Sequence, residues 1–180
     1  MATTESGTKI MSSTLELLRS GGPDAVTIES VAKHSGVART TIYRRYRNRE
    51  EMLTDALVAV GVPDPPPPDM PGEQRMRWVI RRSAAMVFDG IGCGGFAALL
   101  TDTDPEFSTL FRRVLATHRR VLENVLEEGI AAGTIRHDLD PDTLIDGVVG
   151  ALVAERARTG TIAPGWEERA VDTFRSTVLP

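Results

Sequence analysis

The chain has 180 residues, of which 41% are hydrophobic and 26% charged, and its formal net charge is −4. These values are ordinary for a globular protein, and no apolar run approaches the ~20 residues that a membrane span needs. The first residues show no signal peptide, and the single cysteine, Cys93, cannot form an internal disulfide. We therefore expect a cytoplasmic protein with no membrane partner.

Charge is unevenly distributed along the chain. Residues 1–50 contain eight Lys/Arg and five Asp/Glu, whereas residues 51–180 contain thirteen and twenty. Six basic residues and no acidic one fall between Lys33 and Arg49. A basic segment within an acidic chain is best explained by a polyanion that docks on one face, which favours nucleic acid as a partner.

Helical spacing recurs throughout, and the period-two alternation typical of strands never persists, so the sequence predicts an all-α fold. A first helix over about residues 7–20 ends at the Gly-Gly-Pro sequence that follows it. Thr27 is a good N-cap for a second helix, and Gly36 can take the positive φ of a sharp turn. A third helix is expected over about residues 38–46.

The third helix has two distinct faces. At ~100° per residue its basic and polar side chains share one arc, whereas Ile42 and Tyr46 face inward. Asn48 then caps a fourth helix, and Glu51 stands at the spacing of a capping box. This pattern of two short helices, a tight turn and a basic outer face is typical of a helix-turn-helix.

Residues 61–72 interrupt the helical pattern. Six of the eleven prolines lie between Pro63 and Pro71. Proline fixes φ and removes a backbone N–H, so we expect extended polyproline-type chain. A stiff connector is the favoured interpretation, and a ligand for a proline-binding module is the alternative.

A second helical region follows, for a total of about nine helices without a repeat. The glycine-rich segment Gly90–Gly95 is predicted to be a flexible turn that breaks the pattern, followed by a short helix around residues 96–100. Asp104-Pro105 is a strong helix start, because the aspartate caps and the proline suits the first helical position. The longer helices are expected over about residues 73–89, 104–132, 140–159 and 164–178.

The segment TIESVAKHSGVARTTIYRRYRNREEML, residues 27–53, resembles the DNA-binding region of the tetracycline-repressor (TetR) family of transcriptional regulators. The likeness covers roughly residues 8–57, while the remainder is similar only in helix count and layout. The short fourth helix and the proline-rich connector depart from the family pattern. The matching features are Thr27, Val31-Ala32, Gly36-Val37, Thr41-Ile42-Tyr43, Tyr46, Arg49-Glu50 and Leu53.

The resemblance implies a homodimer that binds a palindromic operator in double-stranded DNA. The proline-rich segment divides the chain into a helix-turn-helix domain (residues 1–60), a connector (61–72) and a helical domain (73–180), to which the resemblance assigns effector binding and dimerisation. A small apolar or amphipathic effector is expected to release a repressor from DNA.

The third helix carries the predicted base contacts, Arg39, Thr40 and Arg44, because the planar guanidinium fork suits guanine O6 and N7. Phosphate contacts are predicted for Thr27, at a helix N-terminus, and for Lys33. The resemblance adds Thr41, Tyr43 and Arg49 to the phosphate contacts, the last at a position where the family usually has lysine. The alternative is a merely solvated basic face.

Two further sets of residues are predicted in the second region, and plain intramolecular core is the alternative for both. An apolar effector pocket with one polar group is assigned to Met86, Phe96, Leu99, Phe107, Phe111 and His118. The dimer interface is assigned to Ile145, Val148, Val149, Leu152, Val171 and Phe174.

Other chemistry is not indicated. The three histidines show no metal spacing, Gly90–Gly95 lacks the features of a phosphate loop, and no catalytic pair is evident. We therefore predict no enzyme, no cofactor and no metal. The weaker alternatives are a small-ligand enzyme or carrier with a vestigial helix-turn-helix, a protein-interaction module, and a redox role for Cys93.

Overall fold

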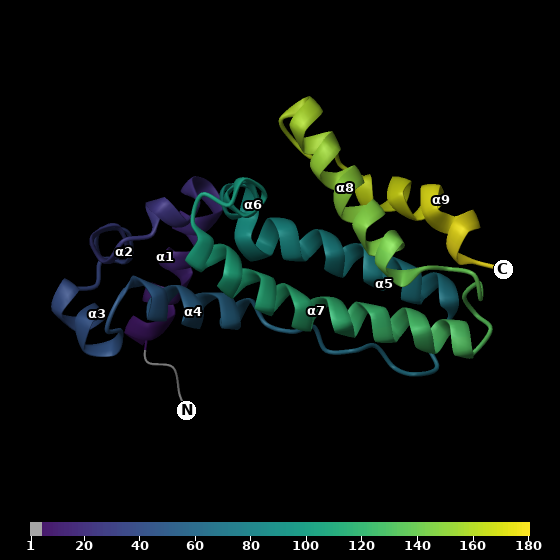
Figure 1. The fold of residues 1–180 in the computed structure, drawn as a ribbon, viewed down its shortest axis with the longest axis horizontal. Helices are drawn as coiled ribbons and strands as arrows, with labels where there is room; N and C mark the ends of the chain where they lie inside the picture. The colour runs from purple at the N-terminus through teal and green to yellow at the C-terminus, as the bar shows by residue number, and fades with distance from the viewer. Residues whose placement is uncertain (1–4) are drawn as a thin grey trace. The chain divides into compact units, whose positions relative to one another are not determined.

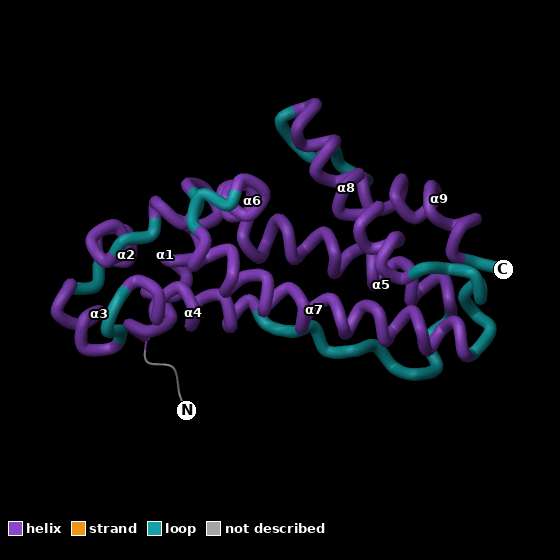
Figure 2. The backbone as a smooth tube through the Cα atoms, viewed as in Figure 1, coloured by secondary structure: helices purple, strands orange, loops and turns teal. Residues whose placement is uncertain are grey.

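The computed structural model describes residues 5–180, and every regular element within them is helical (Figures 1 and 2). The predicted all-α fold is therefore confirmed, and the α-helices of this range number nine. A 3₁₀ turn, η1 (Pro23–Ala25), and a π-helix, η2 (Met86–Ile91), complete them. The α-helices are α1 (Glu5–Gly21), α2 (Ile28–Ser35), α3 (Arg39–Arg45), α4 (Arg49–Val60), α5 (Gly72–Ala85), α6 (Gly92–Thr101), α7 (Pro105–Ala131), α8 (Pro141–Thr159) and α9 (Trp166–Val178).

The chain divides into two compact units. The first contains the chain up to Gly61 together with Met86–Ala116, and the second contains Val62–Ala85 and Thr117–Pro180. The first unit thus holds α1 to α4, η2, α6 and the beginning of α7. The two units are defined by which segments pack together. The division into a DNA-binding domain (residues 1–60), a connector (61–72) and an effector-binding and dimerisation domain (73–180) stays a prediction.

Local signals set the helix boundaries of the first unit. The Thr27 side chain accepts a hydrogen bond from the Ser30 backbone N–H, and Ser30 returns one to Thr27, which completes a capping box at α2. Asn48 caps α4 by accepting a 2.8 Å hydrogen bond from the Glu51 N–H. The Glu51 carboxylate reaches back one residue further than expected, to the Arg47 N–H at 2.7 Å.

The first unit has one continuous apolar core. Helix α1 packs against α2, α4 and α6. The fully buried side chains include Ile10 and Leu18 of α1, Leu57 of α4, and Phe107 and Phe111 of α7. Side chains of the helix-turn-helix and of α7 therefore share the same hydrophobic cluster.

The prediction of a flexible turn at Gly90–Gly95 is wrong, because the chain continues there as the π-helix η2 and then α6. The glycines allow α1 to approach closely, and a Cβ at Gly94 would lie 2.4 Å from the Gly22 nitrogen. The π-helix is also bound by Arg19 of α1, whose guanidinium donates hydrogen bonds to the backbone carbonyl oxygens of Asp89 and Gly90. These tertiary contacts favour helix where glycine content alone favours a turn.

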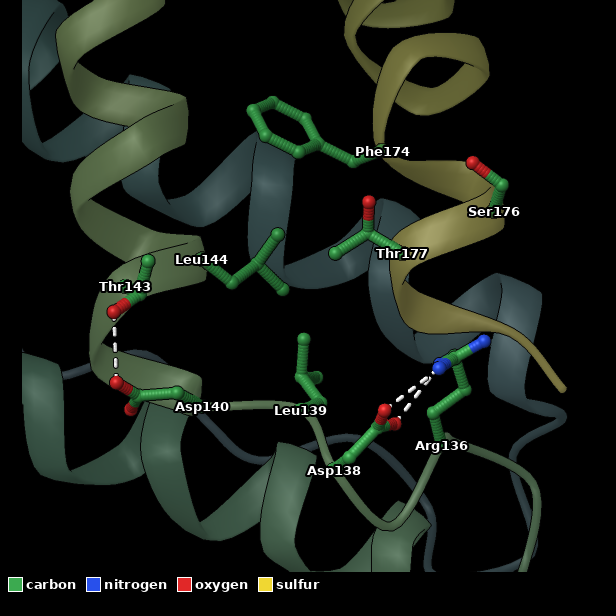
Figure 3. Close-up of a pocket in the computed structure, with 9 residues that line it drawn as sticks. All are labelled: Arg136, Asp138, Leu139, Asp140, Thr143, Leu144, Phe174, Ser176 and Thr177. Carbon is green, nitrogen blue, oxygen red and sulfur yellow. Dashed lines mark hydrogen bonds and ion pairs between the residues drawn. The ribbon is translucent and has the colours of Figure 1, made fainter.

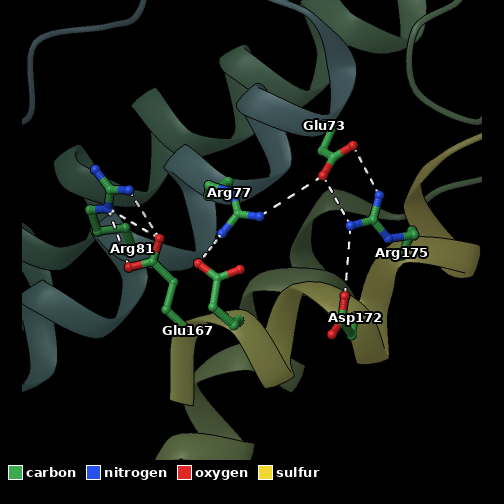
Figure 4. Close-up of polar contacts among 7 residues, drawn as sticks. Glu73, Arg77, Arg81, Glu167, Asp172 and Arg175 are labelled. Carbon is green, nitrogen blue, oxygen red and sulfur yellow. Dashed lines mark hydrogen bonds and ion pairs between the residues drawn. The ribbon is translucent and has the colours of Figure 1, made fainter. Parts of the chain in front are cut away.

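In the second unit, α5 packs against both α8 and α9. Figure 4 shows the ion pairs that accompany this packing along one side of α5 and α9. Arg77 contacts Glu168 at 2.5 Å, and Arg81 contacts Glu167 at 3.0 Å. These side chains are partly or largely solvated, so their contribution to stability is small and sensitive to salt.

Arg75 of α5 is 1% exposed and fastens the proline-rich connector within the second unit. Its guanidinium donates to the carbonyl oxygens of Met70 at 3.0 Å and Pro68, and to Val125 of α7 at 3.1 Å. It also contacts the Glu128 carboxylate at 3.1 Å. The connector, which has no regular secondary structure apart from a turn at its end, is thereby held against the helices of its unit.

Within the described residues, one helical stretch, Gly72–Thr101, is long and apolar enough by length and composition to cross a membrane. The sequence had not indicated such a stretch. Helices of protein cores pass the same test, and this stretch contributes the buried residues Met86, Val87, Ile91 and Ala98. It is therefore weak evidence for a membrane span.

Candidate nucleic-acid interface

Helices α2 and α3 meet at a sharp corner. Gly36 caps α2 in the left-handed conformation, with φ 69°, as the sequence predicts. Val31 of α2 and Ile42 of α3 are fully buried, and Tyr46, which caps the end of α3, is 4% exposed. The two helices are thus joined through their apolar faces, which leaves the opposite face of α3 outside the core.

The predicted base-contacting side chains, Arg39, Thr40 and Arg44, are all exposed on α3. Arg39 forms an ion pair with Glu29 of α2 at 2.9 Å. That pair is solvated, since the Arg39 side chain is 60% exposed and Glu29 is 72% exposed. Exposed pairs of this kind contribute little free energy, so Arg39 can exchange Glu29 for another partner at low cost.

Most of the predicted phosphate-contacting residues surround this face. Thr27 is exposed at the N-terminus of α2, Lys33 is exposed near its end, and Tyr43 is 60% exposed on α3. Thr41 is half-buried. Backbone N–H groups at a helix N-terminus and solvated cations are suitable partners for DNA phosphates.

Arg49 differs from the other predicted phosphate contacts, because its guanidinium is bound within the protein. Its Nε donates to the Val26 carbonyl at 2.8 Å, and its Nη2 donates to the Pro23 carbonyl at 2.6 Å and to Asp104 Oδ2 at 2.8 Å. Sequence reasoning identified Asp104 only as a helix cap. No local pattern pairs it with a residue 55 positions earlier.

The end of α3 is held by a second polar cluster. The Tyr46 hydroxyl donates to Asp55 at 2.7 Å and accepts from Arg45 Nε at 3.2 Å, while the Arg45 guanidinium lies over the Tyr46 ring. Burial raises the pKa of Tyr46, and the hydrogen bond to Asp55 raises it further. The phenol therefore stays protonated and joins α3 to α4, a role of Asp55 that the sequence did not indicate.

The residues predicted for an effector pocket are divided between the two units. Met86, Phe107 and Phe111 are buried in the core of the first unit, and Phe96 and Leu99 pack against that core half-buried. His118, which is 6% exposed, belongs to the second unit. Ser108, next to Phe107, is fully buried, and its hydroxyl has no hydrogen-bond partner.

The residues predicted for dimerisation lie on α8 and α9. Ile145, Val148, Leu152 and Val171 are already buried within one chain, whereas Val149 and Phe174 are half-buried. Phe174 lines a pocket of about 500 Å³ between the beginning of α8 and the end of α9 (Figure 3). Leu139 and Leu144 line the same pocket, and an Arg136–Asp138 ion pair of 2.7 Å lies at its edge.

Two short helices locked at a corner, with a basic recognition helix exposed, define a helix-turn-helix DNA-binding protein. Residues 10–56 match the model of the bacterial regulatory proteins of the tetR family, and residues 74–174 match the tetracyclin repressor-like C-terminal domain. The chain therefore belongs to the TetR family of transcriptional regulators, as its sequence indicated. This family is one of regulators and not of enzymes.

Similar proteins agree with this assignment. The chain is 26% identical over 160 residues to YdeS, an HTH-type transcriptional regulator of Bacillus subtilis, covering 84% of this chain and 78% of YdeS. The fold is similar to that of FadR from Bacillus subtilis in complex with stearoyl-CoA (TM-score 0.62, 16% identity, 92% and 95% of the chains). It is also similar to that of a transcriptional regulator from Saccharomonospora viridis in complex with choline (TM-score 0.65, 14% identity, 96% and 97%).

Proposed function

We propose that this protein is a homodimeric cytoplasmic repressor that binds a palindromic operator and is released by a small apolar or amphipathic effector. Residues 1–60 bind DNA, residues 61–72 connect, and residues 73–180 bind the effector and dimerise. The observation that carries the proposal is the outer face of α3, where Arg39, Thr40 and Arg44 are exposed while Ile42 is buried.

On DNA, α3 enters the major groove. Arg39 and Arg44 donate paired hydrogen bonds to base edges, and Thr40 contacts a neighbouring base. Lys33, Tyr43 and the α2 N-terminus at Thr27 bind phosphates on either side, with a smaller contribution from Thr41. Phosphate contacts provide affinity and orientation, and the base contacts select the sequence.

The effector region is assigned to the shared core of the first unit. Met86, Phe107 and Phe111 provide apolar surface there, and Phe96 and Leu99 border it. The unpaired Ser108 hydroxyl is a polar group that an effector could satisfy, because an unmade buried hydrogen bond costs about 1–3 kcal/mol. Similar folds that bind stearoyl-CoA and choline support an effector with an apolar part.

Release is expected to follow from a change in the spacing of the two recognition helices. In a dimer they must lie about 34–36 Å apart to enter successive major grooves of one duplex. Helices α8 and α9 form the dimer interface, with Val149 and Phe174 closest to the surface. An effector that prefers a different spacing weakens operator binding by the ratio of its affinities for the two states.

The test begins with selection of duplexes from a random library by the wild-type protein. We expect a palindromic consensus, a stoichiometry of two chains per duplex in sedimentation, and repression of a reporter carrying that duplex. Binding that is equally tight to random DNA at two salt concentrations would contradict the proposal. So would a single chain on each duplex, or activation of the reporter.

A further inference from the structure

Arg49, the first residue of α4, joins segments that are distant in sequence. Its guanidinium binds the carbonyls of Pro23 and Val26, which lie in the short segment between α1 and α2. It also binds the Asp104 carboxylate at 2.8 Å, and all of these residues belong to the first unit. The Arg49 side chain is 32% exposed and that of Asp104 is 14% exposed, so water competes only partly for the pair.

Asp104 uses its two carboxylate oxygens for different helices. Oδ2 accepts from Arg49, while Oδ1 accepts from the Phe107 backbone N–H at 2.9 Å and so caps α7. Burial acts to raise the pKa of Asp104, but the hydrogen bonds from Phe107 and Arg49 outweigh it, and the pKa lies below its ordinary value. The carboxylate is therefore ionised at neutral pH, and its negative charge pairs with the positive charge of the guanidinium.

The groups joined in this way have different tasks. The carbonyl of Val26 immediately precedes Thr27, the N-cap of α2 and a proposed phosphate contact. The first turn of α7 carries Phe107, which stacks on Phe111 with ring centroids 6.0 Å apart. One guanidinium thus links the start of the DNA-binding helices to the helix that carries the proposed effector contacts.

We propose that Arg49 and Asp104 are positioning residues that lock α2 and α4 to the first turn of α7, so that the DNA-binding face and the effector-binding helix move together. This inference rests on the proposed function. It assigns Arg49 a task that lysine cannot perform, because a single ammonium lacks the planar fork that reaches two carbonyls and a carboxylate together. A simple phosphate contact, by contrast, requires only a cation.

The first test compares Arg49→Lys with Asp104→Asn. Asparagine is as good an N-cap as aspartate, so Asp104→Asn keeps the α7 cap and removes only the acceptor for Arg49. The matched controls are Arg112→Lys and Asp102→Asn, which alter an exposed ion pair of 3.4 Å in the same unit. Circular dichroism and sedimentation establish that each variant retains its helices and its oligomeric state.

We expect Arg49→Lys and Asp104→Asn each to weaken binding to the selected duplex about tenfold, the usual size of a coupling between two parts of a protein. The slope of log affinity against log salt should not change, since no phosphate contact is removed. The double variant should be little weaker than either single variant, because both break the same link. The controls should bind as the wild type does.

The second test measures coupling without an effector. If the DNA-binding helices and α7 move together, operator binding must also slow hydrogen exchange in the first two turns of α7, around Phe107 to Phe111. Asp104→Asn should abolish this protection while leaving that of α3 in place. The measurement uses the full-length protein with and without the selected duplex.

Three results would overturn the inference. If Arg49→Lys binds like the wild type and Arg49→Ala lowers the salt slope by about one, Arg49 is an ordinary phosphate contact. If both positioning variants bind and exchange like the wild type, the ion pair couples nothing. If the wild type selects no duplex, the proposed function fails and this inference fails with it.

Discussion

Replacing Arg75 with methionine tests how the proline-rich connector is held in the second unit. The Arg75 side chain is 1% exposed, and methionine keeps most of its apolar stem while removing the guanidinium. Of its four acceptors, the Val125 carbonyl lies inside α7 and keeps its helical hydrogen bond, and Glu128 is 57% exposed and regains water. The cost therefore falls mainly on the carbonyls of Pro68 and Met70.

Hydrogen bonds to a charged group contribute about 1.5–3 kcal/mol each, and part of this is recovered because a buried guanidinium no longer has to be desolvated. We therefore expect Arg75→Met to lower the free energy of unfolding by about 2–3 kcal/mol. For a chain of this size that corresponds to a decrease in Tm of roughly 4–12 °C. The exposed Arg81, 62% exposed, provides the control variant Arg81→Met, for which a much smaller loss is expected.

Urea unfolding followed by circular dichroism measures the loss of stability. A protease that cleaves beside aspartate measures release of the connector, which contains Asp64 and Asp69. Arg75→Met should be cut there faster than Arg81→Met under native conditions. If the two variants are equally stable and are cut at the same rate, the buried guanidinium does not hold the connector.

Four further predictions follow from the first unit. Arg44→Ala should reduce the discrimination between bases at one operator position by about 1–3 kcal/mol. Lys33→Ala should instead weaken binding to all sequences alike and reduce the slope of log affinity against log salt by about one. Equal losses of affinity on operator and random DNA for both variants would contradict this division. Tyr46→Phe removes the hydroxyl that donates a 2.7 Å hydrogen bond to Asp55, and should lower the free energy of unfolding by about 1 kcal/mol in urea titrations. No change would mean that water bound to Asp55 compensates for the missing hydroxyl. Gly94→Ala should lower Tm strongly in thermal unfolding, since its Cβ would lie 2.4 Å from the Gly22 nitrogen and 2.8 Å from the Leu18 carbonyl oxygen of α1. An unchanged Tm would show that α1 and α6 can move apart at little cost. Because the folded-state pKa of Asp104 is lowered, the stability that its ionised form contributes is present above the ordinary aspartate pKa of about 3.9 and is lost as pH falls through the folded value. Between about pH 5 and pH 2, Tm should therefore fall less steeply with pH in Asp104→Asn than in the wild type. Parallel curves for the two proteins would refute the assignment.

The identity of the helices and of the DNA-binding face was predictable because both depend on interactions between residues near in sequence. Thr27, Gly36 and Asn48 mark helix ends through capping and φ preferences, and the structure places the boundaries there. Helical periodicity separated Ile42 and Tyr46 from the exposed side chains of α3 in the same way. Glycine propensity failed at Gly90–Gly95, where close packing against α1 outweighed the local preference for a turn.

The partners of long side chains could not be predicted, because they depend on which distant segments meet in the folded chain. Arg49 is the last arginine of the basic segment that begins at Lys33, and only packing brings Asp104 and the carbonyl of Val26 to its guanidinium. Arg75 looks like any helical arginine, yet the connector and α7 enclose it. Local sequence thus specifies where helices begin, end and present their polar faces, whereas burial and distant contacts decide whether a given charge remains available to a ligand.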